Sequence, residues 1–213
     1  MNKTNVVGNI VVDSVYLPVA MNMIVNQALK VKTWDRLVIM EQDTLPPLDA
    51  FDRVDQYTQD IVGSMYFRHS PPHDATVYIQ EENSLLHNPL TPQTVKDWSD
   101  KPGLYECSAV GLGFTSIARS VLENWDKDIP MFSADKSIVD FGSHDLWFCY
   151  QARQQGFKVY VDTGVQCDHL TEVGINLSDN QKNANLVADR PTIKFSIGNN
   201  NKNKKPVKST KRK

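Results

Sequence analysis

The sequence has no hydrophobic run that approaches the ~20 residues of a membrane-spanning helix, so we expect no membrane partner. Residues 1–4 lead into a mixed segment that Asp13 interrupts, which is not the pattern of a secretory signal peptide. Cysteine is scarce, and the three cysteines at positions 107, 149 and 167 are odd in number and widely spaced. This argues against a disulfide framework and predicts a reducing compartment, the cytoplasm, or the host cytoplasm if the chain is viral.

Common nucleotide- and zinc-binding motifs are also missing. Gly111-Leu112-Gly113 does not continue into GxGxxG, no P-loop follows it, and Cys167-Asp168-His169 has no CxxC partner. The two glycines leave bare backbone at the end of an expected strand. Either a ligand approaches the chain closely there, or the chain bends tightly from a strand into a helix.

What the chain does have is an uneven charge distribution. Its net charge is −2, yet residues 199–213 contain seven basic residues and no acidic ones. This segment is rich in Asn, Lys, Ser and Thr and cannot bury enough apolar surface to fold alone. We expect a disordered basic tail, which is either a solvated chain end or an electrostatic arm for nucleic acid.

The hydrophobic pattern alternates between strands and helices, and the length of 213 residues suggests one domain with an appendage. This alternation predicts an α/β fold with a mainly parallel sheet flanked by helices. In such sheets ligands bind beyond the carboxyl ends of the strands. The expected strands are 6–12, 36–40, 61–67, 76–80, 104–110 and 157–161, and the expected helices are 18–31, 46 to about 58, a short one near 94–98, 116–125 and 143–155.

The segment Glu41-Gln42-Asp43 follows the apolar run 36–40 directly. Carboxylates at positions i and i+2 of a turn can point the same way, and they repel each other unless a cation lies between them. Hard oxygen ligands suit Mg²⁺ or Mn²⁺, which are commonly shared with substrate phosphates. The segment therefore indicates a metal–diphosphate site, or else two acidic residues that cap the next helix or lie in solvent.

A second group of candidate residues lies between 139 and 170. His144 and Asp145 are expected in the first turn of a helix, which Ser143 can cap and Gly156 can end. The positive end of the helix dipole would keep the Asp145 carboxylate ionised, as a general base requires, although simple charge matching at a helix end is the alternative. His169 follows a strand, where a neutral imidazole could complete a metal site or simply lie at the surface.

Three segments, taken in order, resemble a known family. They are the apolar strand with Glu41-Gln42-Asp43, then "VGLGFTSIARSVLE", then "GSHDLWFCYQARQQGFKVYVDTGVQCDHL". The sequence resembles GT-A type nucleotide-sugar glycosyltransferases, and is most similar to compact phage or bacterial members of the glycosyltransferase family 2 kind. The resemblance covers roughly residues 15–172 and implies a GT-A, Rossmann-like fold.

The resemblance also implies roles for individual residues. Asp43 would ligate the metal that bridges the nucleotide diphosphate, with His169 as a further metal ligand and Glu41 near the ribose or a metal-bound water. Asp145 would be the base that activates the acceptor in inverting members. Gly111 and Gly113 would line the place where the donor sugar or the acceptor binds.

The sequence departs from the family pattern in three places. Glu41 replaces the usual Asp, and His144 replaces the usual Glu before Asp145. Only ~17 residues precede the helix that begins at Pro18, whereas a βαβ unit needs ~30. We therefore expect a GT-A domain at 1–175 with an incomplete N-terminal nucleotide-binding part, a C-terminal extension at 176–198 and the tail at 199–213. An unpaired sheet edge near the N-terminus would be covered by a second copy or by a partner chain.

The expected function is that of a metal-dependent, hexosyltransferase-like glycosyltransferase. It would move a sugar from a nucleoside-diphosphate sugar to a hydroxyl acceptor with inversion, using Mn²⁺ or Mg²⁺. Two other readings stay open from the sequence. One is a catalytically silent module that binds sugars or nucleotide sugars, and the other is a phage DNA-modifying glycosyltransferase whose basic tail holds nucleic acid.

Overall fold

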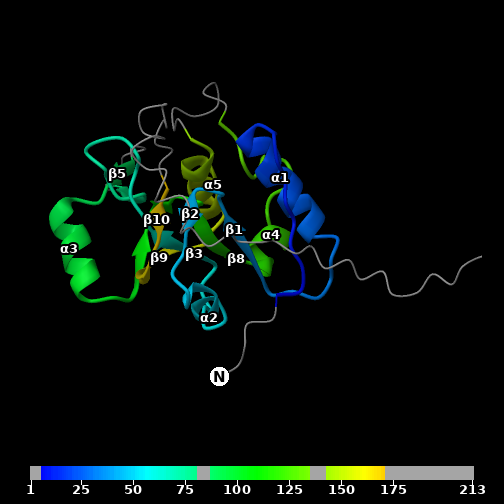
Figure 1. Cartoon of the computed structure of the whole chain (residues 1–213). Coiled ribbons are helices and arrows are strands. Elements are labelled where there is room, and N and C mark those ends of the chain that lie inside the picture. The colour runs from blue at the N-terminus through cyan, green and yellow to red at the C-terminus, as the bar shows by residue number, and fades with distance from the viewer. Residues whose placement is uncertain (1–5, 81–86, 135–142, 171–213) are drawn as a thin grey trace, which may run out of the picture. The chain divides into compact units, whose positions relative to one another are not determined.

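The computed structural model describes residues 6–80, 87–134 and 143–170 (Figure 1). Its centre is a five-stranded sheet in the order β1-β8-β3-β9-β6. The strands are β1 (Arg36–Met40), β3 (Ile61–Met65), β6 (Leu104–Cys107), β8 (Phe114–Ala118) and β9 (Val159–Gln166). The α/β class expected from the sequence is confirmed.

The strand directions are more mixed than the sequence predicted. Strands β1, β3 and β9 run in one direction, and β8 and β6 run in the other. The only parallel neighbours in this described sheet are β3 and β9, because β8 is inserted between β1 and β3. The carboxyl ends of β1 and β3 nevertheless meet at the same edge of the sheet, which is the edge where the sequence placed the site.

Two small sheets and five helices complete the described part of the chain. One small sheet pairs β2 (Thr44–Leu45) with β10 (Asp168–His169), and the other has the order β5-β4-β7. Its strands are β4 (Val77–Gln80), β5 (His87–Pro89) and β7 (Ala109–Val110). The helices are α1 (Leu17–Ala28), α2 (Ala50–Val54), α3 (Pro92–Asp100), α4 (Arg119–Glu123) and α5 (His144–Gln154). None of these helices is long and apolar enough to cross a membrane.

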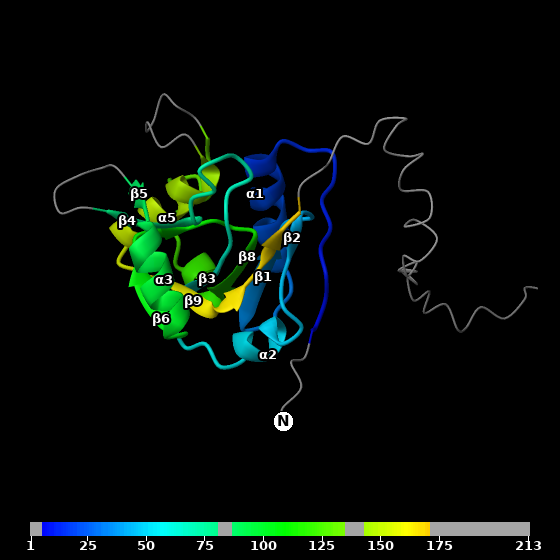
Figure 2. The same cartoon turned by 60° about the vertical axis from the view of Figure 1, so that its left-hand side comes forward.

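Hydrophobic clusters cover both faces of the central sheet. Ile117 of β8 packs in the larger cluster with residues of α1, α4 and α5, and Phe114 of the same strand packs in a smaller cluster with residues of α2. Positions an odd number apart in a strand face opposite sides, so the two clusters lie on opposite faces. Figures 1 and 2 agree, since α1 and α5 lie above the sheet and α2 lies below it in both views.

The predicted strand at 6–12 is wrong. The structure leaves this segment extended but unpaired, and the side chains of Val7 and Val11 are 58% and 79% exposed. Its β-branched residues favour a strand, but a strand also needs a hydrogen-bonding neighbour, and none of the described strands pairs with it. Strand β1 therefore has β8 as its only described neighbour, and the expected unpaired sheet edge is present.

The predicted helix at 116–125 begins too early. Residues 114–118 form β8, which is hydrogen-bonded to β1 on one side and to β3 on the other, and α4 begins only at Arg119. Pairing on both sides decides the conformation of this short apolar segment, because helix and strand patterns overlap over so few residues.

Other boundaries also differ from the prediction. The expected strand 104–110 breaks into β6 and β7, which belong to different sheets. The helix expected from Pro46 is only the five residues of α2, because β2 precedes it. The helix expected near 94–98 is longer, at Pro92–Asp100. The expected extension at 176–198 and tail at 199–213 lie outside the described residues.

Candidate metal centre

The turn after β1 directs Asp43 towards the end of the chain's last described strand. The backbone N–H of Glu41 donates to the carbonyl of Gly113 at 2.9 Å, and the N–H of Thr44 donates back to the carbonyl of Glu41 at 3.2 Å. Strand β2 then pairs with β10, so that Thr44 lies opposite His169, and the N–H of Leu170 donates to the carbonyl of Asp43 at 2.7 Å. This small sheet explains why Asp43 and His169 meet although they are far apart in the sequence.

Asp43 faces the Nε2 atoms of two histidine side chains. Its Oδ2 atom is 3.5 Å from Nε2 of His169 and 3.5 Å from Nε2 of His69. The potential ligand atoms of the three residues all lie within 4.8 Å of one another. Ligand atoms bound at about 2.0–2.2 Å from one ion are themselves roughly 3–3.5 Å apart, which matches the two distances from Asp43, so the three side chains are a candidate site for a divalent cation. We call Asp43, His69 and His169 the metal triad.

The orientation of His169 is fixed by a second hydrogen bond. Its Nδ1 lies 2.7 Å from the carbonyl oxygen of Phe67, and a carbonyl can only accept, so Nδ1 carries the proton. This bond leaves Nε2 as the nitrogen that faces Asp43. Tyr66 packs edge-on against the ring with 5.0 Å between centroids. In metal-binding histidines, the ring nitrogen that does not face the metal commonly donates a hydrogen bond to a backbone carbonyl, as Nδ1 does in His169.

His69 was not among the residues predicted from the sequence. It lies on the 67–75 hairpin, which connects β3 to β4 and is closed by a bridge between Phe67 and Ala75. Its ring is stacked against that of His169, with 3.5 Å between centroids and a tilt of 33°. The available signal was its place two residues after the expected strand 61–67, at the same sheet edge where β1 ends.

Glu41 does not belong to the metal triad. Its Oε1 atom faces His144 of α5, 4.0 Å from Nε2, and Nε2 of His144 has no hydrogen-bond partner among the described residues. Burial raises the pKa of Glu41 to about 7, and the charges of Asp145 and Asp43 add to this shift. Burial lowers the pKa of His144, which favours the neutral ring.

Asp145 lies in the first turn of α5, as predicted, and its Oδ1 atom accepts a hydrogen bond from the N–H of Leu146 at 2.9 Å. Burial raises the pKa of Glu41 and of Tyr66, and the charge of Asp145 adds to both shifts. Ser143 holds the N-cap position, but its side chain makes no capping hydrogen bond.

Gly111 and Gly113 are explained by packing inside the protein. A Cβ atom at Gly111 would be 2.2 Å from Oη of Tyr66, and one at Gly113 would be 2.5 Å from Oγ1 of Thr44. The N–H of Gly113 also donates to Oη of Tyr66 at 3.0 Å. Buried contacts thus account for both glycines, and their contact with a donor or acceptor stays a prediction.

A shallow pocket of about 310 Å³ opens beside the metal triad. Side chains of the 67–75 hairpin form one wall and residues of the β9–β10 segment form the other. The pocket is lined by Phe67, Arg68, His69, His73, Cys167, Asp168 and His169. A pocket that contains two of the three potential ligands is large enough for a charged group that shares the ion.

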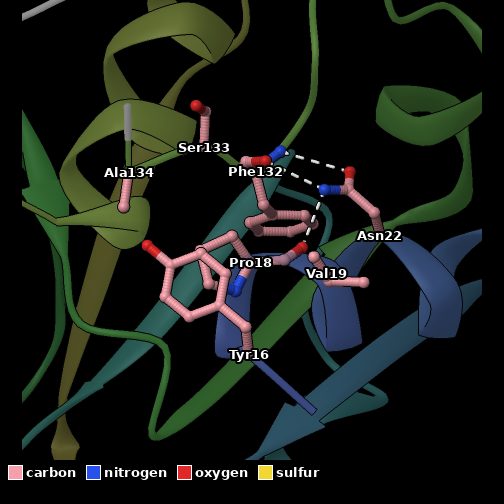
Figure 3. A pocket seen from close by; sticks show the side chains of 7 residues that line it. All are labelled: Tyr16, Pro18, Val19, Asn22, Phe132, Ser133 and Ala134. Carbon is pink, nitrogen blue, oxygen red and sulfur yellow. Dashed lines mark hydrogen bonds between the residues drawn. The ribbon is translucent and has the colours of Figure 1, made fainter. Parts of the chain in front are cut away.

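A second pocket, of about 280 Å³, lies at the start of α1 (Figure 3). Asn22 connects its two walls, donating from Nδ2 to the carbonyls of Pro18 at 2.7 Å and Phe132 at 2.8 Å. The N–H of Phe132 donates back to Oδ1 of Asn22 at 3.3 Å. Among the residues that the structure describes, no charged residue and no predicted site residue lines this pocket.

No protein-family profile and no curated protein sequence matches the chain. Among solved structures, the chain is similar to A197 from STIV, with a TM-score of 0.53 and 20% identity over 74% of this chain and 69% of that one. It also aligns with GalNAc-T7, solved with UDP, GalNAc and Mn²⁺, at a TM-score of 0.43 and 14% identity over 74% of this chain and 30% of that one. At 20% identity, the likeness to A197 concerns the fold alone. The chain has the fold of the GT-A type glycosyltransferases that its sequence resembles.

Proposed function

We propose that the protein is a metal-dependent glycosyltransferase that transfers a sugar from a nucleoside-diphosphate sugar to a hydroxyl acceptor. The observation that carries this proposal is the metal triad at the carboxyl edge of β1 and β3 in a GT-A fold. Two imidazoles and a carboxylate whose potential ligand atoms lie within 4.8 Å of one another form a ligand set that a divalent ion could use. A divalent ion held there would stabilise the negative charge that develops on a departing diphosphate.

The composition of the triad favours Mn²⁺ over Mg²⁺. Mg²⁺ prefers oxygen ligands and keeps several waters, whereas imidazole nitrogen is a good ligand for transition-metal ions. Two of the three triad residues are histidines. Phosphate oxygens of the donor would fill positions that Asp43, His69 and His169 leave open.

Asp145 is the residue we assign as the base. In an inverting transfer the acceptor oxygen forms a bond to the anomeric carbon while the bond from that carbon to the diphosphate oxygen breaks. The proton of the acceptor hydroxyl passes to the Asp145 carboxylate, which lies at the positive end of α5 and near Glu41. Its neighbour His144 is held neutral by burial and would be the next candidate if Asp145 were not the base.

The decisive experiment measures Mn²⁺-dependent turnover and binding with a panel of nucleoside-diphosphate sugars. Asp43→Ala should abolish both, because the triad loses the residue that both histidines face. Its melting temperature without metal should stay close to that of the wild type. Asp128→Asn removes an exposed carboxylate outside the site and serves as the control. A large loss of stability in Asp43→Ala would instead assign the residue a structural role.

Substitution of the base separates catalysis from binding. Asp145→Asn keeps the shape of the side chain and should lower kcat at least ~100-fold with little change in donor Kd. Wild-type turnover in this variant would show that another group takes the proton. Tight donor binding without turnover in the wild-type protein itself would support the alternative of a silent nucleotide-sugar-binding module.

A further inference from the structure

The 67–75 hairpin holds the backbone of Arg68 in a defined position beside the metal triad. The N–H of Arg68 donates to the carbonyl of Asp74 at 2.9 Å, and the carbonyl of Arg68 accepts a hydrogen bond from Nδ1 of His73 at 2.9 Å. His73 has a left-handed backbone with a φ of 59°, which few residues other than glycine adopt readily. The hairpin is therefore a built structure in which both backbone groups of Arg68 are used.

The side chain of Arg68 lines the same pocket as His69 and His169. It is exposed, and the described residues offer it neither a hydrogen bond nor an ion pair, although Asp168 lines the pocket too. An arginine without a protein partner beside a potential metal ion is available for an anion. A guanidinium can bind two phosphate oxygens at once, and such charge-assisted pairs are among the stronger hydrogen bonds.

Tyr78 gives a second indication of where Arg68 lies. Burial raises the pKa of Tyr78, and the charge of Asp145 adds to this rise while the charge of Arg68 opposes it. The pocket itself places Arg68 beside two residues of the metal triad, His69 and His169.

We propose that Arg68 is a diphosphate-binding residue, which contacts one phosphate group in the pocket while the metal triad holds the ion that contacts the same diphosphate. The 67–75 hairpin would then supply both a metal ligand, His69, and the phosphate-binding cation. As a statement about the sugar donor this rests on the proposed function, but the recognition itself requires only a diphosphate.

The test uses inorganic pyrophosphate as the probe, titrated calorimetrically into the full chain in the presence of Mn²⁺. Arg68→Ala should weaken pyrophosphate binding about tenfold, which corresponds to ~1.4 kcal/mol. Arg68→Lys keeps the positive charge but loses the planar guanidinium that can bind two phosphate oxygens at once. It should show a loss of pyrophosphate affinity between those of the wild type and Arg68→Ala. Lys127→Ala removes an exposed positive charge that does not line the pocket and should bind as the wild type does. The affinity for Mn²⁺ alone should be the same in all four proteins.

Each result decides between the two proposals. If Arg68→Ala binds pyrophosphate as tightly as the wild type, the inference is wrong, and turnover of nucleotide sugars would still support the glycosyltransferase. If Arg68→Ala loses affinity for Mn²⁺ itself, the inference is also wrong, because the residue would act through His69. Arg68-dependent pyrophosphate binding without turnover or binding of any nucleotide sugar would support the inference and reject the proposed function.

Discussion

The metal triad combines residues with very different sequence signals. Asp43 and His169 could be proposed from the sequence, because each follows an apolar strand and matches a family motif. His69 carries no such motif, yet it stands in the same relation to Asp43, at 3.5 Å, as His169 does. The first two residues are held by the β2–β10 pair, whereas His69 depends on the 67–75 hairpin.

Mutation of His69 tests whether it is a ligand. Loss of one of three protein ligands should weaken Mn²⁺ binding by about 10- to 100-fold. Removal of a group that only orients a metal ligand typically has an effect of this size. Because an ion that binds only the folded state stabilises it, His69→Ala should also reduce the rise in Tm that Mn²⁺ causes. Lys127→Ala is the control, since it changes an exposed residue that does not line the pocket and should keep the full rise. An unchanged rise in His69→Ala would show that His69 is not a ligand.

Strands β3 and β7 pack so closely that there is no room for an added methyl group between them. Gly63 in the middle of β3 faces Val110 of β7, and a Cβ atom at position 63 would be 2.6 Å from Cγ2 of Val110. Both residues are buried, so neither side chain has room to move into solvent. This close approach brings the central sheet and the β5-β4-β7 sheet together next to the hairpin that carries His69.

A double-mutant cycle measures the coupling energy between positions 63 and 110. Gly63→Ala should lower the free energy of unfolding by about 1–3 kcal/mol through overpacking. Val110→Ala alone should also destabilise, because it leaves a cavity. The double variant should be more stable than the sum of the two losses implies, since the smaller side chain makes room for the new methyl group. Urea unfolding gives all four values, and strictly additive losses would contradict the contact.

The described molecule ends on one side with an unpaired strand. Strand β1 has β8 as its only described neighbour, and residues 6–13 run past the sheet without pairing to a described strand (Figure 2). Val7 and Val11 of this segment are more than half exposed. Free backbone groups on an edge strand and an exposed β-branched segment are both sites at which another chain can add a strand.

We therefore expect the 213-residue chain to self-associate, with residues 6–12 of one copy pairing with β1 of the other. Sedimentation at several concentrations should show a dimer that dissociates on dilution. Replacing Val7 and Val11 together by lysine should shift the equilibrium to the monomer without affecting Mn²⁺ binding. A wild-type protein that stays monomeric at all concentrations would contradict this expectation.

The sequence alone was enough for elements whose signal is local. The apolar run 36–40 predicted β1 with its correct bounds, and the segment from Ser143 to Gly156 predicted α5 to within a residue at each end. Both have a clear hydrophobic pattern and clear residues at their ends, and these depend only on neighbours in the chain. The motif pair of Asp43 and His169 is local in the same sense, because each residue follows its own strand.

The folded chain was needed wherever the outcome depended on a distant partner. Residues 114–118 became a strand because β1 and β3 flank them, and 6–12 stayed unpaired because no described strand does. His69 became part of the metal triad only because β3 ends at the same sheet edge as β1 and its hairpin turns back over His169. Strand pairing and side-chain convergence are contacts between remote segments, and a pattern within one segment does not encode its partner.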